Sequence, residues 1–229
     1  MQMQWSLLIN KYLKQLINAV IAGLLMGLAG TAYLYCLGIG NQVLGSFLFG
    51  FGFLFIALYG YELYTNKAGY MVENKWIYIL DCLIAILGNI IGTWLIALVL
   101  KMTSFLDAGS AISCGLGLFL TPKIGDALVF DYFGRSLLGG LIMYITYNTY
   151  KKAEQPIARF MSLFLGAFFI TFLGLDEFVS DMFMFNTGIL VGYEGGFLIT
   201  HLVYVFIGNT LGALIIPALR KLKGVLKSI

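Results

Sequence analysis

The feature that most constrains this chain is a long stretch without charge, because residues 15–61 contain no Asp, Glu, Lys or Arg. A membrane-spanning helix needs about 20 apolar residues, so the stretch is long enough for two helices. Gly38, Gly40 and Asn41 would form the turn between them. The pattern predicts an all-α membrane protein with six transmembrane helices. Further apolar stretches lie near 76–100, 126–150, 156–185 and 194–219, and a shorter one lies at 108–120.

The composition excludes an ordinary soluble enzyme. Only 11% of the residues are charged and 60% are hydrophobic, whereas a soluble domain carries about 25% charged residues. We expect one transmembrane domain over 1–229, without a separate catalytic domain. The sequence has neither an H-E-x-x-H nor a G-x-S-x-G motif, and its three cysteines lack metal-ligand spacing. We therefore expect no enzymatic activity, no cofactor and no metal. The net charge of +3 does not indicate a nucleic-acid partner, and the expected surroundings are a lipid bilayer.

The distribution of basic residues predicts the orientation. If the N-terminus is cytoplasmic and six helices follow, eleven Lys and Arg residues lie inside and three lie outside, namely Lys101, Lys123 and Arg135. Cytoplasmic segments of membrane proteins carry an excess of Lys and Arg. We therefore predict a multi-pass protein of the plasma membrane with both termini in the cytoplasm.

A G-N-x-x-G motif occurs in the third predicted helix and again in the sixth. Small residues at this spacing pack helices closely, and such packing alone would be a sufficient role for each copy. An odd number of spans separates the two halves, so the copies run through the membrane in opposite directions. This predicts an inverted repeat of two three-helix halves, about 15–105 and 106–220. The motif residues are Gly88, Asn89 and Gly92 in one copy and Gly208, Asn209 and Gly212 in the other.

The second and fifth predicted helices are each interrupted by polar residues beside a glycine. The second helix ends in residues 60–66, around Glu62, and the fifth is broken at 174–177 and resumes through Asp181. Non-helical backbone at membrane depth is tolerated only where it lines a cavity or is buried in protein. Interruptions in corresponding helices indicate a substrate path near the midplane. The sequence therefore predicts a transporter or channel.

Five motifs in the correct order resemble the formate/nitrite transporter family. The two G-N-x-x-G motifs match the third and sixth helices of the family. Residues 21–28 resemble its first-helix A-G-x-x-x-G-x-G, residues 60–66 its G-A-E-L-F-T-G loop, and residues 174–183 its G-F-E-H-S-V-A-N-M-F segment. The resemblance implies an aquaporin-like fold and a homopentamer with one pore per subunit. It also implies passage of small monovalent anions or their weak acids, such as formate or nitrite.

The polar centre departs from the pattern of the family. Glu177 occupies the position of the central histidine, and Asp181 that of the asparagine four residues later. Gly140 stands where the fourth helix has an asparagine, and His201 replaces an asparagine on the sixth helix. A lysine expected near the outer mouth has a neighbour in Lys123, one residue away in the alignment. The resemblance is therefore stronger for the fold than for the substrate.

The charge state of the predicted centre leaves two functions open. Ionisable groups within spans are candidates for function, and Glu177 and Asp181 lie four residues apart, on one face of a resumed helix. A protonated Glu177 could donate a hydrogen bond to a passing anion, which would couple anion flux to protons. Ionised carboxylates of Asp176, Glu177 and Asp181 in the path would instead favour cations or neutral solutes.

Each acidic residue also has a structural interpretation. Glu177 could accept hydrogen bonds from backbone N–H groups at the broken helix, and Asp176 could cap that helix. Asp181 could lie near the outer surface in water. Glu62 most resembles the loop carboxylate of the family, and we interpret it as an organiser of the loop rather than a substrate contact.

His201 is the only histidine of the chain. It is either an interhelical hydrogen-bonding residue or the partner of Glu177 across the two halves. Constrictions in such pores are formed by apolar side chains. Tyr64 and Thr65 take the places of the loop phenylalanine and threonine of the family, and Ile170 lies about two turns before the second break. We expect these three residues to line the path.

Overall fold

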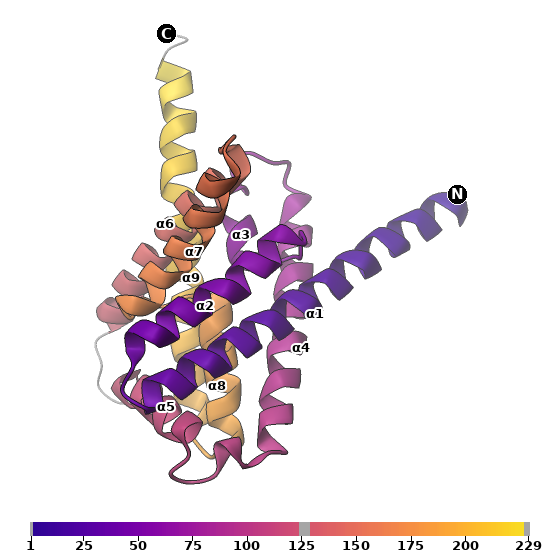
Figure 1. Ribbon diagram of the computed structural model, residues 1–229. Coiled ribbons are helices and arrows are strands. Elements are labelled where there is room, and N and C mark those ends of the chain that lie inside the picture. Colours follow the sequence, from indigo (N-terminus) through magenta and orange to yellow (C-terminus); the bar gives the residue numbers. More distant parts are fainter. Residues whose placement is uncertain (1, 124–128, 227–229) are drawn as a thin grey trace.

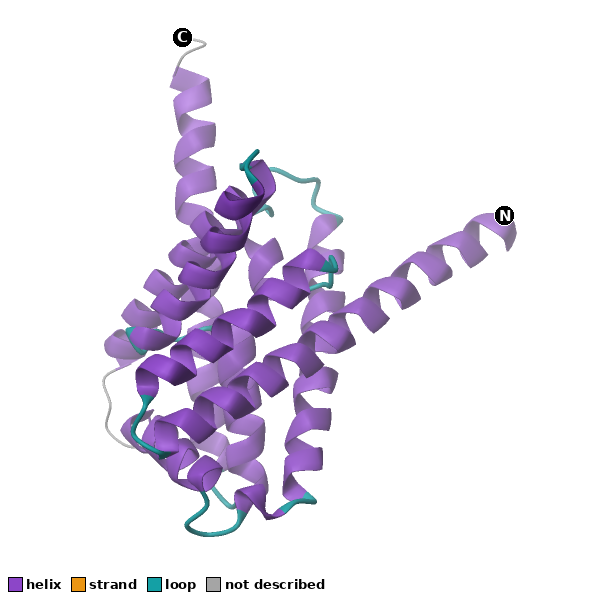
Figure 2. Cartoon of the chain, viewed as in Figure 1, coloured by secondary structure: helices purple, strands orange, loops and turns teal. Residues whose placement is uncertain are grey.

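The computed structural model describes residues 2–123 and 129–226, and within these ranges it is helical and contains no strand (Figure 2). The prediction of an all-α protein is confirmed. The elements are α1 (Gln2–Gly38), α2 (Gln42–Leu58), α3 (Tyr64–Ala68), α4 (Tyr78–Lys101), η1 (Ser104–Leu106), α5 (Ala111–Leu120), η2 (Thr121–Lys123), α6 (Val129–Lys152), α7 (Pro156–Phe172), α8 (Phe178–Leu190) and α9 (Gly195–Leu226).

Three helices of the described chain are long and apolar enough to cross a membrane. They are α4, α9 and the part of α1 over Leu8–Gly38. The helices α2, α7 and α8 are apolar but shorter, because the predicted second and fifth spans are each divided in two. The fourth predicted span corresponds to α6, and its first residues, 126–128, lie outside the described residues.

Two pairs of closely packed helices frame the molecule. Helix α1 packs along α4, and α6 packs along α9, while α3 and α8 lie between these pairs (Figure 1). The glycines of the repeated motif permit the close approach. A Cβ atom on Gly92 would lie 2.2 Å from the carbonyl oxygen of Val20, and one on Gly212 would lie 2.0 Å from that of Leu137. Both positions therefore require glycine.

We expect Gly212→Ala to destabilise the protein by about 1–3 kcal/mol, because the added methyl group forces α6 and α9 apart. Gly224→Ala is the matched control on the same helix, since a Cβ atom there meets nothing within 4 Å. The control should be neutral, or stabilising by up to about 1 kcal/mol, because alanine favours the helix over glycine. Thermal unfolding in detergent would compare the two variants, and equal midpoints would contradict the packing argument.

Glycines with positive φ angles form both interruptions. Helix α2 ends at Leu58, and Gly60 in the loop before α3 has φ = 68°. Helix α7 ends at Phe172, and Gly174 before α8 has φ = 66°. Glycine adopts this left-handed conformation without a Cβ clash. The two loops lead into the helices α3 and α8, which start inside the bundle.

Candidate pore site

Asn89 of α4 fixes the loop before α3. Its Oδ1 atom accepts a hydrogen bond from the backbone N–H of Tyr64 at 3.0 Å. Its Nδ2 atom donates to the carbonyl oxygens of Ala19 at 2.8 Å and Glu62 at 3.0 Å. The bonds to Tyr64 and Glu62 satisfy backbone groups at the interruption, which a buried site requires, and the bond to Ala19 connects the loop to α1.

Asn209 of α9 makes the equivalent contacts in the second half of the chain. Its Oδ1 atom accepts from the N–H of Phe178 at 2.8 Å, and its Nδ2 atom donates to the carbonyls of Ser136 at 2.6 Å and Asp176 at 2.9 Å. Both asparagines are completely buried. The asparagine of G-N-x-x-G thus holds a helix start, the preceding loop and a neighbouring long helix together in both copies.

The starts of α3 and α8 meet in an aromatic cluster. The rings of Tyr64 and Phe178 are 5.5 Å apart between centroids, and Phe206 of α9 lies 5.4 Å and 5.2 Å from them, respectively. The Tyr64 hydroxyl is hydrogen-bonded to that of Thr210 at 2.6 Å. Tyr64 was predicted from the sequence, whereas Phe178 and Phe206 were not. The sequence does contain a signal for Phe178. It lies four residues after Gly174, just as Tyr64 lies four residues after Gly60.

Glu177 caps helix α8 and is almost completely buried. Its Oε2 atom accepts a hydrogen bond from the backbone N–H of Ser180 at 2.7 Å, and the Ser180 hydroxyl donates to the Glu177 carbonyl at 2.9 Å. The Thr65 hydroxyl lies close to the carboxylate. Neither that hydroxyl nor Glu177 Oε1 has a hydrogen bond of standard geometry to the described part of the chain. One carboxylate oxygen, Oε2, therefore caps the helix, and the other, Oε1, has no hydrogen-bond partner among the described residues.

A second polar cluster contains Lys123, Asp176 and Asp181. The Lys123 ammonium pairs with Oδ1 of Asp176 and lies 3.3 Å from Oδ2 of Asp181. It also lies over the ring of Phe119, 3.8 Å from the centroid. The two carboxylate side chains are 0% and 1% exposed, so the alternative that Asp181 lies in water is wrong. The expectation that Asp176 caps α8 is also wrong, because Glu177 occupies that position.

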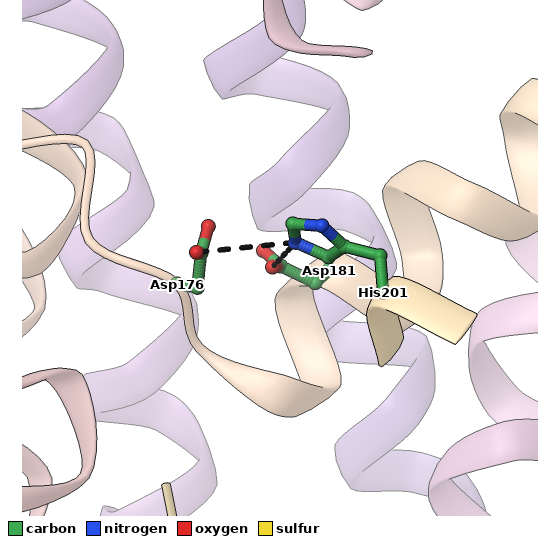
Figure 3. Close-up of side chains that lie close together, drawn as sticks. All are labelled: Asp176, Asp181 and His201. Carbon is green, nitrogen blue, oxygen red and sulfur yellow. Dashed lines mark ion pairs between the residues drawn. The ribbon is translucent and has the colours of Figure 1, made fainter. Parts of the chain in front are cut away.

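His201 points at this acidic pair. Its Nε2 atom lies 3.9 Å from Asp176 Oδ2 and 4.0 Å from Asp181 Oδ2 (Figure 3). Its ring packs against those of Tyr132 and Phe185, with centroids 4.0 Å and 5.1 Å away.

The prediction that His201 pairs with Glu177 is wrong, because the ion-pair partners of His201 are Asp176 and Asp181. Over residues 2–123 and 129–226, no ion pair joins His201 to Glu177. The reason is the backbone, which is extended at Glu177, with φ = −125° and ψ = 123°. Consecutive side chains of extended chain point to opposite sides, so Glu177 turns to the start of α8 and Asp176 turns to Lys123 and His201.

Lys123 was compared with a lysine of the family but was not selected as a pore residue. The sequence does contain a signal for it, because Lys123 is the only Lys or Arg between Lys101 and Arg135. A lone basic residue in an apolar region, facing two acidic residues elsewhere in the spans, indicates a buried ion pair.

Glu62 lies in the first loop, as predicted, and contacts Lys67. The two side chains form a salt bridge of 2.7 Å, and the Glu62 carbonyl is held by Asn89. These contacts agree with a role in organising the loop. Glu62 and Lys67 also line a cavity of about 250 Å³ with Tyr147 and Lys151.

Ile170 is buried near the end of α7, where its carbonyl oxygen accepts a hydrogen bond from the N–H of Leu175. The residue thus lies directly before the second interruption. Its place in the permeation path stays a prediction.

Apolar helices of spanning length, together with interrupted helices around buried polar side chains, are typical of multi-pass membrane channels and transporters. The family model described as "Formate/nitrite transporter" matches residues 6–222. The chain belongs to this family.

Two solved structures share the fold. One, described as "Pentameric formate channel with formate bound", is 16% identical, with a TM-score of 0.79 over 95% of this chain and 98% of the other. The second, an "FNT family ion channel", is 18% identical, with a TM-score of 0.76 over 95% and 92% of the chains. No curated protein matches the chain in a sequence search.

Proposed function

We propose that the protein conducts small monovalent anions or their weak acids, such as formate or nitrite, across the plasma membrane. The observation that carries this proposal is the buried pair of Glu177 and Thr65, which lies where the two divided helices meet. Membership in the formate/nitrite transporter family supports it. The likeness to a pentameric channel with formate bound supports a homopentamer with one pore per subunit.

The proposed assembly has both termini in the cytoplasm and consists of one domain with two halves of opposite orientation, about 15–105 and 106–220. The equivalent hydrogen bonds of Asn89 and Asn209 support this repeat. In each half, an asparagine of the third long helix bonds to the N–H of the first residue of the resumed helix. Coincidence does not readily produce such a match, because it requires the same register in three separate elements.

The proposed path begins at the cavity beside Lys67 and Lys151, where positive charge attracts anions. It continues past Tyr64 and its aromatic neighbours, with Ile170 nearby, to Glu177 and Thr65. Asp176, Asp181, His201 and Lys123 follow on the far side. Aromatic narrow points exclude hydrated ions, so an ion must lose water or charge to pass.

Glu177 is the group that would make this passage possible. An ionised carboxylate repels an anion, whereas a protonated one donates a hydrogen bond to it. Placing an ionised, incompletely paired carboxylate inside a membrane is costly, which favours the protonated form. Thr65, whose hydroxyl lies close to the carboxylate, could offer a second donor to the same ion. Passage would then be coupled to protons.

A cation or neutral solute is the second candidate, and it is favoured by a specific observation. Asp176 and Asp181 place two buried carboxylates in the proposed path against the single ammonium group of Lys123. Such an excess of negative charge attracts cations.

Reconstitution in liposomes separates the two candidates. Reversal potentials would be measured under gradients of potassium formate, potassium chloride and the sodium salts at pH 5.5 and 7.5. A potential that follows formate, or electroneutral formate uptake that acidifies the lumen, would support the proposal. A potential that follows potassium or sodium with every anion would replace it with the cation candidate.

Glu177→Gln should weaken the pH dependence of formate flux. Glutamine remains neutral and keeps a donor group, so flux at pH 7.5 should approach that at pH 5.5. We expect the ratio of the two rates to fall by at least about threefold relative to the wild type, because general acid–base groups affect rates by larger factors. Glu154→Gln, in an exposed loop, is the control and should keep the wild-type ratio. An unchanged ratio in Glu177→Gln would exclude this role.

A further inference from the structure

The acidic pair and His201 form a buried group of metal-ligand types (Figure 3). One carboxylate oxygen from each of Asp176 and Asp181 and one imidazole nitrogen of His201 lie within 4.8 Å of one another. All three side chains are at most 2% exposed. They come from the loop before α8, from the first turn of α8 and from α9, so the tertiary fold holds them together.

Several polar atoms of this group lack partners. Nδ1 and Nε2 of His201 and Oδ2 of Asp176 are buried without a hydrogen bond to any described residue. Buried polar atoms in native proteins are nearly always satisfied. Nε2 of His201 and Oδ2 of Asp176 face one another across 3.9 Å, which is too far for a hydrogen bond but suits two ligands of one ion.

The charges of the group also leave room for a cation. Asp176 and Asp181 carry two negative charges, and Lys123 supplies one positive charge. With a neutral imidazole, the buried group keeps a net charge of about −1, which is costly unless a cation compensates it. Glu177 adds a further carboxylate, on the other side of the chain. Arg135, on α6, does not neutralise the group, because its side chain is about half exposed and pairs with Asp131.

We propose that Asp176, Asp181 and His201 bind a divalent metal ion of the Zn²⁺ class. Zinc accepts His nitrogen and carboxylate oxygen at about 2.0–2.2 Å, so two tetrahedral ligands lie about 3.3–3.5 Å apart. His201 Nε2 is 3.9 Å and 4.0 Å from the two carboxylate oxygens, and the three ligand atoms lie within 4.8 Å of one another. Side-chain shifts of about 0.5–1.5 Å would complete the geometry. Water takes the fourth position.

Lys123 limits the affinity of this site. Its ammonium already pairs with both carboxylates, so an incoming ion must displace it from at least one of them. The Lys123 side chain is a flexible four-carbon stem, so its ammonium group can move away from the carboxylate. Binding of the ion can be measured without knowing which solute the channel conducts.

Calorimetry with Zn²⁺ tests the proposal on the intact protein, purified with a tag that contains no histidine. Cys114 is an exposed free thiol, so all variants would carry Cys114→Ser. We expect one ion per subunit and a weakening of at least about tenfold in His201→Gln, because that variant removes a ligand. Replacing Zn²⁺ by Co²⁺ gives an optical readout, since a visible absorption band of the bound ion should also be lost in His201→Gln.

Two further variants sharpen the test. Lys123→Met should bind Zn²⁺ at least about tenfold more tightly, because the competing ammonium is gone. Asp131→Asn, at an exposed position on α6, is the control and should bind like the wild type. The absence of binding to the wild type, or equal binding in His201→Gln, would overturn the proposal even if Lys123→Met does not fold. Gel filtration would establish that each variant keeps the wild-type oligomeric state.

Discussion

Lys123→Met is expected to destabilise the protein by about 3–5 kcal/mol, because it removes the ammonium group that pairs with two buried carboxylates. The cost arises from the charges that stay behind. Asp176 and Asp181 would face each other inside the bundle without the ammonium group. The midpoint of thermal unfolding in detergent should fall by roughly 10 °C for a loss of this size.

The matched control is Lys101→Met, an exposed lysine at the end of α4, which should unfold at the wild-type temperature. A double variant identifies the cause. Lys123→Met combined with Asp181→Asn removes one of the two stranded charges, so it should recover a large part of the lost stability. If Lys123→Met unfolds at the same temperature as the wild type, the ion pair contributes nothing to the stability. If the double variant is less stable still, packing of the lysine stem is the larger effect.

Asn209→Ala should destabilise the protein at least as much as Lys123→Met. The change removes three buried hydrogen bonds and leaves the N–H of Phe178 and the carbonyl of Asp176 without these partners, whereas the carbonyl of Ser136 lies inside the continuous helix α6. Each buried group left unsatisfied costs about 1–3 kcal/mol. The start of α8 carries Glu177, so we expect the proposed formate flux to disappear together with the thermal stability.

Asn89→Ala offers an internal comparison, since Asn89 makes the equivalent three bonds in the first half. The two variants should lose similar stability, within about a factor of two to three given the context dependence of buried hydrogen bonds. Asn74→Ala is the control, because Asn74 is exposed and its side chain donates a local hydrogen bond to the Tyr70 carbonyl one turn away. A variant of Asn209 with wild-type stability would show that water or neighbouring groups replace the amide.

The features predicted correctly from sequence are those that local patterns encode. Apolar stretches of spanning length gave the long helices, and glycines beside polar residues marked both interruptions, where Gly60 and Gly174 have positive φ angles. The G-N-x-x-G copies identified the two buried asparagines. The motifs also placed the chain in its family, which the match over residues 6–222 confirms.

The partners of the buried charged groups were not predictable in this way. Lys123 and Asp176 are 53 residues apart, and no periodic pattern connects an ammonium after α5 with a loop before α8. Asp176 and Glu177 are adjacent and chemically alike, so composition did not distinguish the residue that caps α8 from the one that pairs with Lys123.

The sequence by itself therefore determined the class of protein, the family and the helices, because spanning length, glycine conformation and motif order are properties of short segments. The tertiary structure alone decided which carboxylate faces which cation. That choice depends on the extended backbone at Glu177, which sends neighbouring side chains to opposite sides, and on the packing of α9, which brings His201 to Asp176 and Asp181. Contacts between segments far apart in the chain depend on how all the helices pack together.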